Sequence, residues 1–193
     1  MIIKLPSPNF KSNISLEETI KKRRSIRKFK PYKISLEEIS QLLWAAYGVS
    51  DEKSGFRTVP SAGATYPLEV YYLTEEGVFH YLPYNHSAES VIQKDVRNLI
   101  VEASLGQRFI MEAAIDILLC AVYERTTLCY GERGYRYVYM EVGHSAQNIS
   151  LQAISLGLDS VCIGAFYDEK LREILLLPID VHPLYIVAIG KRS

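Results

Sequence analysis

The sequence predicts an α+β fold in which one domain, residues 1–193, is built on a mixed sheet flanked by helices. Segments with helical spacing of apolar residues alternate with short β-rich runs. Some of these runs follow each other directly, as in a hairpin, and others are separated by helices. The chain has 193 residues, 48% of them hydrophobic, which is enough to bury a core without disulfides or metals.

Two helices are predicted near the N-terminus. Segments 15–18 and 35–38 both have the S-x-x-E pattern, in which a hydroxyl and a carboxylate satisfy the free N–H groups of a helix start. Apolar residues recur at helical spacing over 36–46, and the pattern stops at Gly48. One face of the second helix is therefore expected to be buried.

The middle of the chain predicts a hairpin, two short helices and a buried strand. A polar stretch, 50–63, leads into two β-rich segments joined by Glu-Glu-Gly, which is typical of a hairpin. A helical pattern then breaks near Gly106 and gives way to a continuous apolar run, typical of a fully buried strand. In chain order these elements are predicted at residues 69–74, 78–82, 95–105, 107–114 and 115–123.

The C-terminal part predicts a long helix and then two strands with a helix between them. The long helix ends at Gly157, because glycine most readily adopts the left-handed conformation that follows a helix. Asp168 is expected to cap the next helix. In chain order these elements are predicted at residues 135–156, 161–166, 168–177 and 184–190.

Charge and composition exclude several classes of protein. Twenty-two Lys and Arg balance twenty-two Asp and Glu, which argues against a surface built for nucleic acid or anionic lipid. The longest apolar run, 117–123, is far shorter than the roughly 20 residues of a membrane span, and the start lacks a secretory signal. Three cysteines without a C-x-x-C pair and four histidines without helical pairing predict neither disulfides nor a metal site. We therefore expect a soluble, cytoplasmic protein.

The densest charge lies in residues 21–30, which hold seven cations and no acid. Arg23, Arg24 and Arg27 offer planar forks of donors that match phosphate oxygens, and Ser25 adds a hydroxyl. This pattern favours an anion site. Its alternative is a helix whose last turn carries cations that interact well with the helix dipole, followed by a solvated linker.

Two further stretches fit either a ligand or plain packing. Small residues over 60–67 let the backbone approach a flat ligand closely, although a simple turn has the same composition. Tyrosines over 130–139 fit the lining of a pocket for a planar cofactor or substrate, and equally a helix or subunit interface. The chain has neither G-x-G-x-x-G nor a P-loop, so Rossmann-type dinucleotide binding and P-loop phosphoryl transfer are not predicted.

Four motifs carry a family resemblance when they are taken together. They are RRSIRKF at 23–29, PSAGATYPLE at 60–69, GYRY and EVGHSAQN within 134–148, and IGAF at 163–166. In this order and spacing they resemble the nitroreductase superfamily, and most closely its SagB-type dehydrogenases, the flavin oxidases of thiazole and oxazole peptide biosynthesis. The resemblance implies a mainly antiparallel central sheet between helices and a homodimer with FMN at the subunit interface.

The resemblance also implies three groups of cofactor-binding residues. Those implied to hold the phosphate and ribityl chain are Arg23, Arg24, Ser25, Arg27, Lys191 and Arg192. Those implied to come from the partner chain and to pass over the ring system are Pro60, Ser61, Ala62 and Gly63. Ile163 and Gly164 are implied to offer backbone N–H groups to the flavin N5 and O4 edge.

The implied activity is hydride transfer through flavin N5. We expect NADH or NADPH as the donor and a small electron-poor acceptor, such as a nitro compound or a quinone. Azoline-oxidising members of the family carry a Lys-Tyr pair before the long helix, where this chain has Cys129 and Tyr130. Tyr130 is the candidate catalytic acid. Because the lysine is replaced, azoline oxidation ranks behind the nicotinamide-dependent reaction and is its alternative. A flavin-binding module without turnover is a further alternative.

Overall fold

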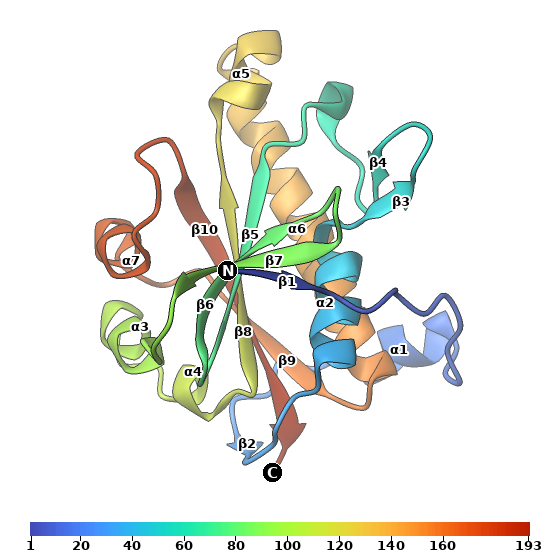
Figure 1. Ribbon diagram of the computed structural model, residues 1–193, viewed down its shortest axis with the longest axis vertical. Helices are drawn as coiled ribbons and strands as arrows, with labels where there is room; N and C mark the ends of the chain where they lie inside the picture. Colours follow the sequence, from blue (N-terminus) through green and yellow to red (C-terminus); the bar gives the residue numbers. More distant parts are fainter.

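Eight strands form one sheet in which every pair of neighbouring strands is antiparallel (Figure 1). The computed structural model describes residues 1–193. The strand order is β1-β7-β6-β5-β8-β10-β2, and β9 also pairs with β10. The strands are β1 (Ile2–Lys4), β2 (Phe29–Lys30), β5 (Leu68–Thr74), β6 (Gly77–Leu82), β7 (Ser87–Ile92), β8 (Ile115–Ala121), β9 (Asp159–Ile163) and β10 (His182–Arg192), and a separate hairpin holds β3 (Val49–Asp51) and β4 (Phe56–Arg57).

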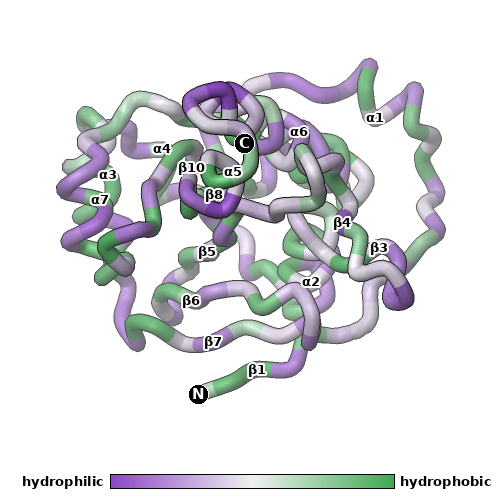
Figure 2. The backbone as a smooth tube through the Cα atoms, turned by 90° about the horizontal axis from the view of Figure 1, so that it is seen from above, coloured by the Kyte–Doolittle hydropathy of each residue, from purple (hydrophilic) through white to green (hydrophobic).

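Helices cover both faces of this sheet. Figure 2 shows α3, α4 and α7 on one side of the strands and α2 and α6 on the other. The helices are α1 (Leu16–Lys22), α2 (Leu36–Tyr47), α3 (Arg97–Ala103), α4 (Phe109–Glu112), α5 (Glu124–Tyr130), α6 (Arg133–Ser155), α7 (Asp168–Leu175) and the short 3-10 turn η1 (Ala62–Ala64). None of them combines the length and the apolar character that a membrane span requires.

The central strand β8 divides two hydrophobic cores. Ile117 and Leu119 face the core beneath α2 and α6, while Leu118 and Cys120 face the core beneath α3, α4 and α7. All of β8 is buried. A strand covered on both faces favours apolar residues on both, which explains the apolar run from Ile117 onward and confirms the predicted buried strand; Asp116 is its one charged residue.

The predicted helix boundaries have the expected chemistry. Ser35 Oγ accepts the Glu38 N–H at 3.2 Å, and the Glu38 carboxylate accepts the Ser35 N–H at 2.8 Å, so the capping box of α2 is complete. The helix ends at Gly48, where a Cβ atom would lie 2.4 Å from the Trp44 ring. Gly157 follows α6 with φ +70°, as predicted.

Several local predictions were wrong. The stretch expected to be polar loop, 50–63, contains the β3–β4 hairpin, and β1, β2, β7 and α5 were not predicted. β1 and β2 have only three and two residues, too few for any periodicity, so their partner strands define them. Asp168 is the first residue of α7 and makes no side-chain cap, because Tyr167 occupies the capping position.

Candidate functional site

The predicted anion-binding residues come together at one end of the sheet, and we call this region the basic end. The Ile26 N–H donates to the Ser160 carbonyl of β9 at 3.0 Å, and β2 pairs with the last two residues of β10. The chain segment that follows α1 therefore lies beside the C-terminal segment. The basic end consists of Arg23, Arg24, Ser25, Arg27, Lys191 and Arg192.

Most cations of the basic end have no acidic partner. The structure contains six ion pairs, and of these residues only Arg192 takes part, with Asp159 at 2.7 Å. Arg24 Nη1 donates to the carbonyls of Lys21 and Arg23 at 3.0 and 2.7 Å, an arrangement suited to a helix end. Arg23, Arg27 and Lys191 remain uncompensated, so the region attracts anions.

The strand β9 leads away from the basic end to Ile163 and Gly164. Burial raises the pKa of the Cys162 thiol of β9, and the hydrogen bonds with Ser150 and Tyr185 and the positive charge of Arg23 act against this rise. Gly164 is exposed, and a Cβ atom there would lie 3.6 Å from the Tyr185 ring, an ordinary contact. The chain's own packing does not require glycine at 164. The missing side chain at this position instead leaves the backbone open to an external group.

The small-residue loop lies elsewhere, and with Tyr130 it forms what we call the loop end: Pro60, Ser61, Ala62, Gly63 and Tyr130. Ser61 Oγ accepts the Tyr66 N–H at 3.0 Å, which fixes the loop from within. Gly63 has φ +59°, and a Cβ atom there would lie 2.7 Å from the Tyr130 hydroxyl oxygen. The loop therefore needs glycine at 63 for both its backbone conformation and its contact with Tyr130.

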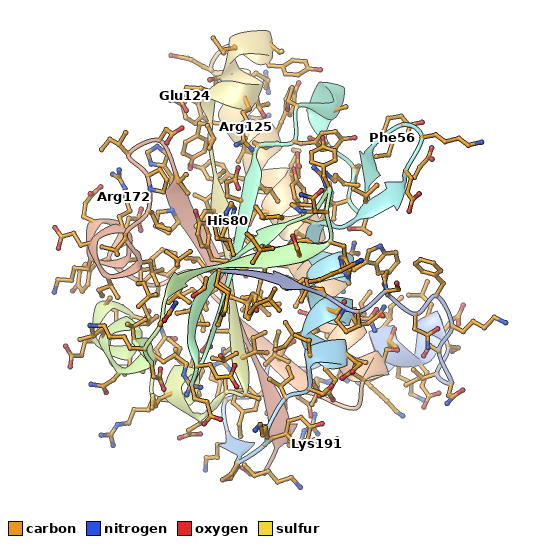
Figure 3. The ribbon with its side chains drawn as sticks, viewed as in Figure 1. Phe56, His80, Glu124, Arg125, Arg172 and Lys191 are labelled. Carbon is orange, nitrogen blue, oxygen red and sulfur yellow. The ribbon has the colours of Figure 1, made fainter.

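The basic end and the loop end lie at opposite ends of the folded molecule. β10 begins at His182, which pairs with Ala121 just before α5, and its Lys191 pairs with β2. At 3.3–3.4 Å per residue, the nine steps from His182 to Lys191 span about 30 Å. Figures 1 and 3 show α5 at the top of the molecule and Lys191 beside the C-terminus at the bottom.

The tyrosines before and within α6 divide into two packed groups. Tyr123 contacts Tyr135 and His182 with ring centroids 4.9 and 5.1 Å apart, while Tyr130 meets Tyr137 edge to face at 5.1 Å. Burial raises the pKa of Tyr123, so its hydroxyl stays protonated. Packing therefore accounts for these rings, while Tyr135 and Tyr130 remain about two-fifths exposed and open to contact from outside.

Sequence reasoning missed the polar groups that support the loop end. The Tyr47 hydroxyl donates to the Glu141 carboxylate at 2.6 Å, and burial raises the pKa of that carboxyl. Glu69 bridges His80 and Arg125. These partners are distant in the sequence, and the one available signal was the predicted hairpin, which brings residues 69–74 close to residues 78–82.

An antiparallel sheet of this strand order between two helical layers, with a basic patch at the end of its longest strand, is a nitroreductase-like fold. Residues 20–191 match the Nitroreductase family. The chain belongs to that family, whose members are oxidoreductases. Within the whole chain, no three His, Cys, Asp or Glu side chains gather where they could hold a metal ion.

Three relatives illustrate this membership. A Methanocaldococcus jannaschii protein with the provisional name nitroreductase is 49% identical over 185 residues, covering 93% of this chain and 92% of the relative. A Ralstonia eutropha structure with the same provisional name superimposes with a TM-score of 0.90 at 30% identity, covering all of this chain and 90% of that one. The Microcin B17-processing protein of Escherichia coli is 30% identical over 170 residues, covering 82% of this chain and 62% of its own length.

Proposed function

We propose that this chain is an FMN-dependent oxidoreductase that transfers a hydride from NADH or NADPH to a small electron-poor acceptor, such as a nitro compound or a quinone. The observation that carries the proposal is the basic end, where Arg23, Arg27 and Lys191 have no acidic partner. A phosphate monoester carries about two negative charges at neutral pH. Three free cations and the Ser25 hydroxyl match that charge and its oxygen acceptors.

The proposed roles of the other residues follow the path of β9. The exposed Gly164, which follows the buried Ile163 at the end of β9, offers its backbone to the ring system, at the position where a flavin gains charge on reduction. FMN, when bound, accepts a hydride at N5 and passes electrons on, while the protein supplies orientation and electrostatics. Tyr130 supplies a phenol that donates a hydrogen bond or a proton to the acceptor.

A second copy of the chain completes the proposed site. The loop end lies about 30 Å from the basic end along β10, too far for both to hold one ring system within a single chain. In a homodimer, the exposed Pro60 and Gly63 of one subunit lie over the flavin held by its partner. Met140 and Gly143 are exposed on α6 and belong to the proposed interface.

The visible absorption spectrum of the purified protein, recorded anaerobically before and after addition of NADH or NADPH, tests this function. We expect flavin bands that bleach on addition of one or both nicotinamides. A colourless protein that FMN cannot reconstitute contradicts the proposal. Stopped-flow mixing separates an enzyme from a flavin-binding module, because an inert carrier does not bleach rapidly.

Azoline oxidation is the second candidate function. The likeness to the Microcin B17-processing protein supports this candidate. By the family resemblance of the sequence, Tyr130 matches the tyrosine of the azoline-oxidising members. Cys129 replaces their lysine and is exposed, so a base can be restored there without disturbing the core. We expect Cys129→Lys to give faster flavin bleaching by a thiazoline peptide than Cys129→Met. Equal and negligible bleaching in both variants excludes this activity.

A further inference from the structure

Arg57 is a buried cation that makes no hydrogen bond through its side chain. It ends β4, is 8% exposed, and forms none of the six ion pairs. Its Nε and Nη1 atoms are closed off from solvent and have no acceptor. Leaving a buried charged donor unsatisfied is unfavourable, so this arrangement calls for a compensating partner.

Three tyrosine rings surround the Arg57 guanidinium. Its central carbon lies 4.2 Å from the ring centroid of Tyr84, 5.3 Å from that of Tyr66 and 5.4 Å from that of Tyr47. Such cation–π contacts stabilise the positive charge through the ring faces. They accept no N–H hydrogen bond in the plane of the guanidinium, so the need for an anionic acceptor remains.

Arg57 and these three rings line a cavity of about 480 Å³ that also contains Glu69, His80 and Arg125. This volume lies within the range of small-molecule sites. Figure 3 shows Arg125 and His80 in the upper half of the molecule, far from Lys191 at the bottom. The cavity is therefore separate from the basic end.

The two arginines and one carboxylate that line this cavity give it one excess positive charge. Glu69 is its single carboxylate, and it accepts hydrogen bonds from His80, at 2.6 Å, and from Arg125. Although burial acts to raise the pKa of Glu69, the partners His80 and Arg125 lower it, so the carboxylate is ionised and compensates Arg125. Arg57 remains without a counter-ion.

We propose that this cavity binds a small monocarboxylate carried on a flat ring. The carboxylate pairs with the Arg57 guanidinium and supplies the missing acceptor oxygens, while the ring packs against the tyrosines. A monoanion matches the single excess charge, whereas a dianion leaves one charge uncompensated. The cavity adjoins the loop end, since Ala64, Thr65 and Tyr66 line it, but its binding of a carboxylate through Arg57 does not require a bound flavin.

Calorimetric titration of the purified full-length protein with sodium benzoate tests the proposal. We expect benzoate to bind the unmodified protein and the Arg108→Met variant, which removes an exposed arginine from the position just before α4. Benzyl alcohol, the neutral analogue, should bind at least tenfold more weakly. Arg57→Met should weaken benzoate binding at least tenfold, and Arg57→Lys should weaken it less. Unchanged benzoate affinity in a folded Arg57→Met variant overturns the proposal.

A crystal soaked with 4-bromobenzoate provides a test that needs no variant. The anomalous signal of bromine should lie among the rings of Tyr47, Tyr66 and Tyr84, and the visible spectrum of any bound flavin should stay unchanged. Bromine located only over a flavin, or no bound bromine at all, contradicts the proposal. A protein that binds benzoate in the cavity but contains no flavin upholds this inference while refuting the proposed function.

Discussion

The basic end and the loop end satisfy their polar groups in opposite ways. At the loop end the chain supplies both partners of its contacts: Ser61 accepts from Tyr66, and directly beside the loop the Thr65 and Thr126 hydroxyls lie 2.8 Å apart. At the basic end, Arg23 and Arg27 are charged and lack carboxylate partners. The loop end is therefore stable as it stands, whereas the basic end is completed by an anion.

This difference predicts that the loop end contributes mainly to the stability of the fold, whereas the basic end contributes mainly to the binding of an anionic cofactor. Substitutions at the loop end should change the free energy of unfolding, because they remove contacts within the chain. Substitutions at the basic end should leave that energy almost unchanged and should instead change the affinity for an anionic cofactor. The following predictions test this division, starting with the largest expected effect.

The Arg23→Ala/Arg27→Ala double variant should lose FMN while it remains folded. Each charged hydrogen bond to phosphate contributes about 1.5–3 kcal/mol, so the Kd for FMN should rise by roughly two to four orders of magnitude. Fluorescence titration of the flavin-free protein measures this change, with circular dichroism as the check on folding. The matched control, Lys94→Ala/Arg108→Ala, removes two exposed cations from elsewhere on the surface. A double variant that is purified with a full complement of flavin contradicts the assignment.

Glu69→Gln should lower the free energy of unfolding at pH 7 by about 1–3 kcal/mol, because it weakens the charged hydrogen bonds to His80 and Arg125. The folded-state pKa of Glu69 lies below its ordinary value of 4.5, so this stabilisation is complete above that value and is lost as the pH falls through the lowered one. Urea unfolding should therefore show a smaller difference between wild type and variant at pH 3 than at pH 7. Lys191→Met, with no acidic partner to lose, should change stability by less than about 0.5 kcal/mol at either pH.

Gly63→Ala should destabilise the chain by about 1–2 kcal/mol, because residue 63 adopts a left-handed backbone conformation and the added methyl meets the Tyr130 hydroxyl. In a Tyr130→Phe background the same substitution should cost less, because the hydroxyl is gone. Urea unfolding of the four proteins of this double-mutant cycle measures the coupling. Equal costs in both backgrounds show that Tyr130 does not constrain the loop.

Gly143→Leu gives the smallest effect on stability. This glycine lies within α6, is exposed, and has open space where a Cβ atom would be. In an isolated subunit, leucine should therefore stabilise the helix by about 0.5–1 kcal/mol. If α6 packs closely against a second copy, the same side chain weakens the dimer, which sedimentation analysis over a range of concentrations measures. An unchanged dimer shows that this part of α6 is not in the interface.

The elements that the sequence predicted correctly are those defined by local patterns. The capping box and apolar face of α2, the β5–β6 hairpin, the apolar run of β8 and the length of α6 are each visible within one segment. β2 and α5 lack such a pattern, because β2 is only two residues long and α5 begins with polar residues that no capping side chain precedes.

The candidate site was predictable to a similar extent. The cations at 21–30 are visible as a local charge run, but their position beside Lys191 and Arg192 depends on the pairing of β2 with β10. Arg57 carries no signal at all in the sequence. Its environment consists of tyrosines from separate parts of the chain, which only the folded structure brings together.

Subunit complementation tests the central claim most directly, namely that two chains share each site. One partner is the Arg23→Ala/Arg27→Ala variant, and the other is Ala62→Trp, which places a bulky ring on the loop end. Each homodimer should fail to bind FMN. After unfolding together and refolding, mixed dimers should contain one intact site each, so about a quarter of all sites should bind flavin. If the mixture binds no more flavin than either variant alone, each site belongs to a single chain and the account is wrong.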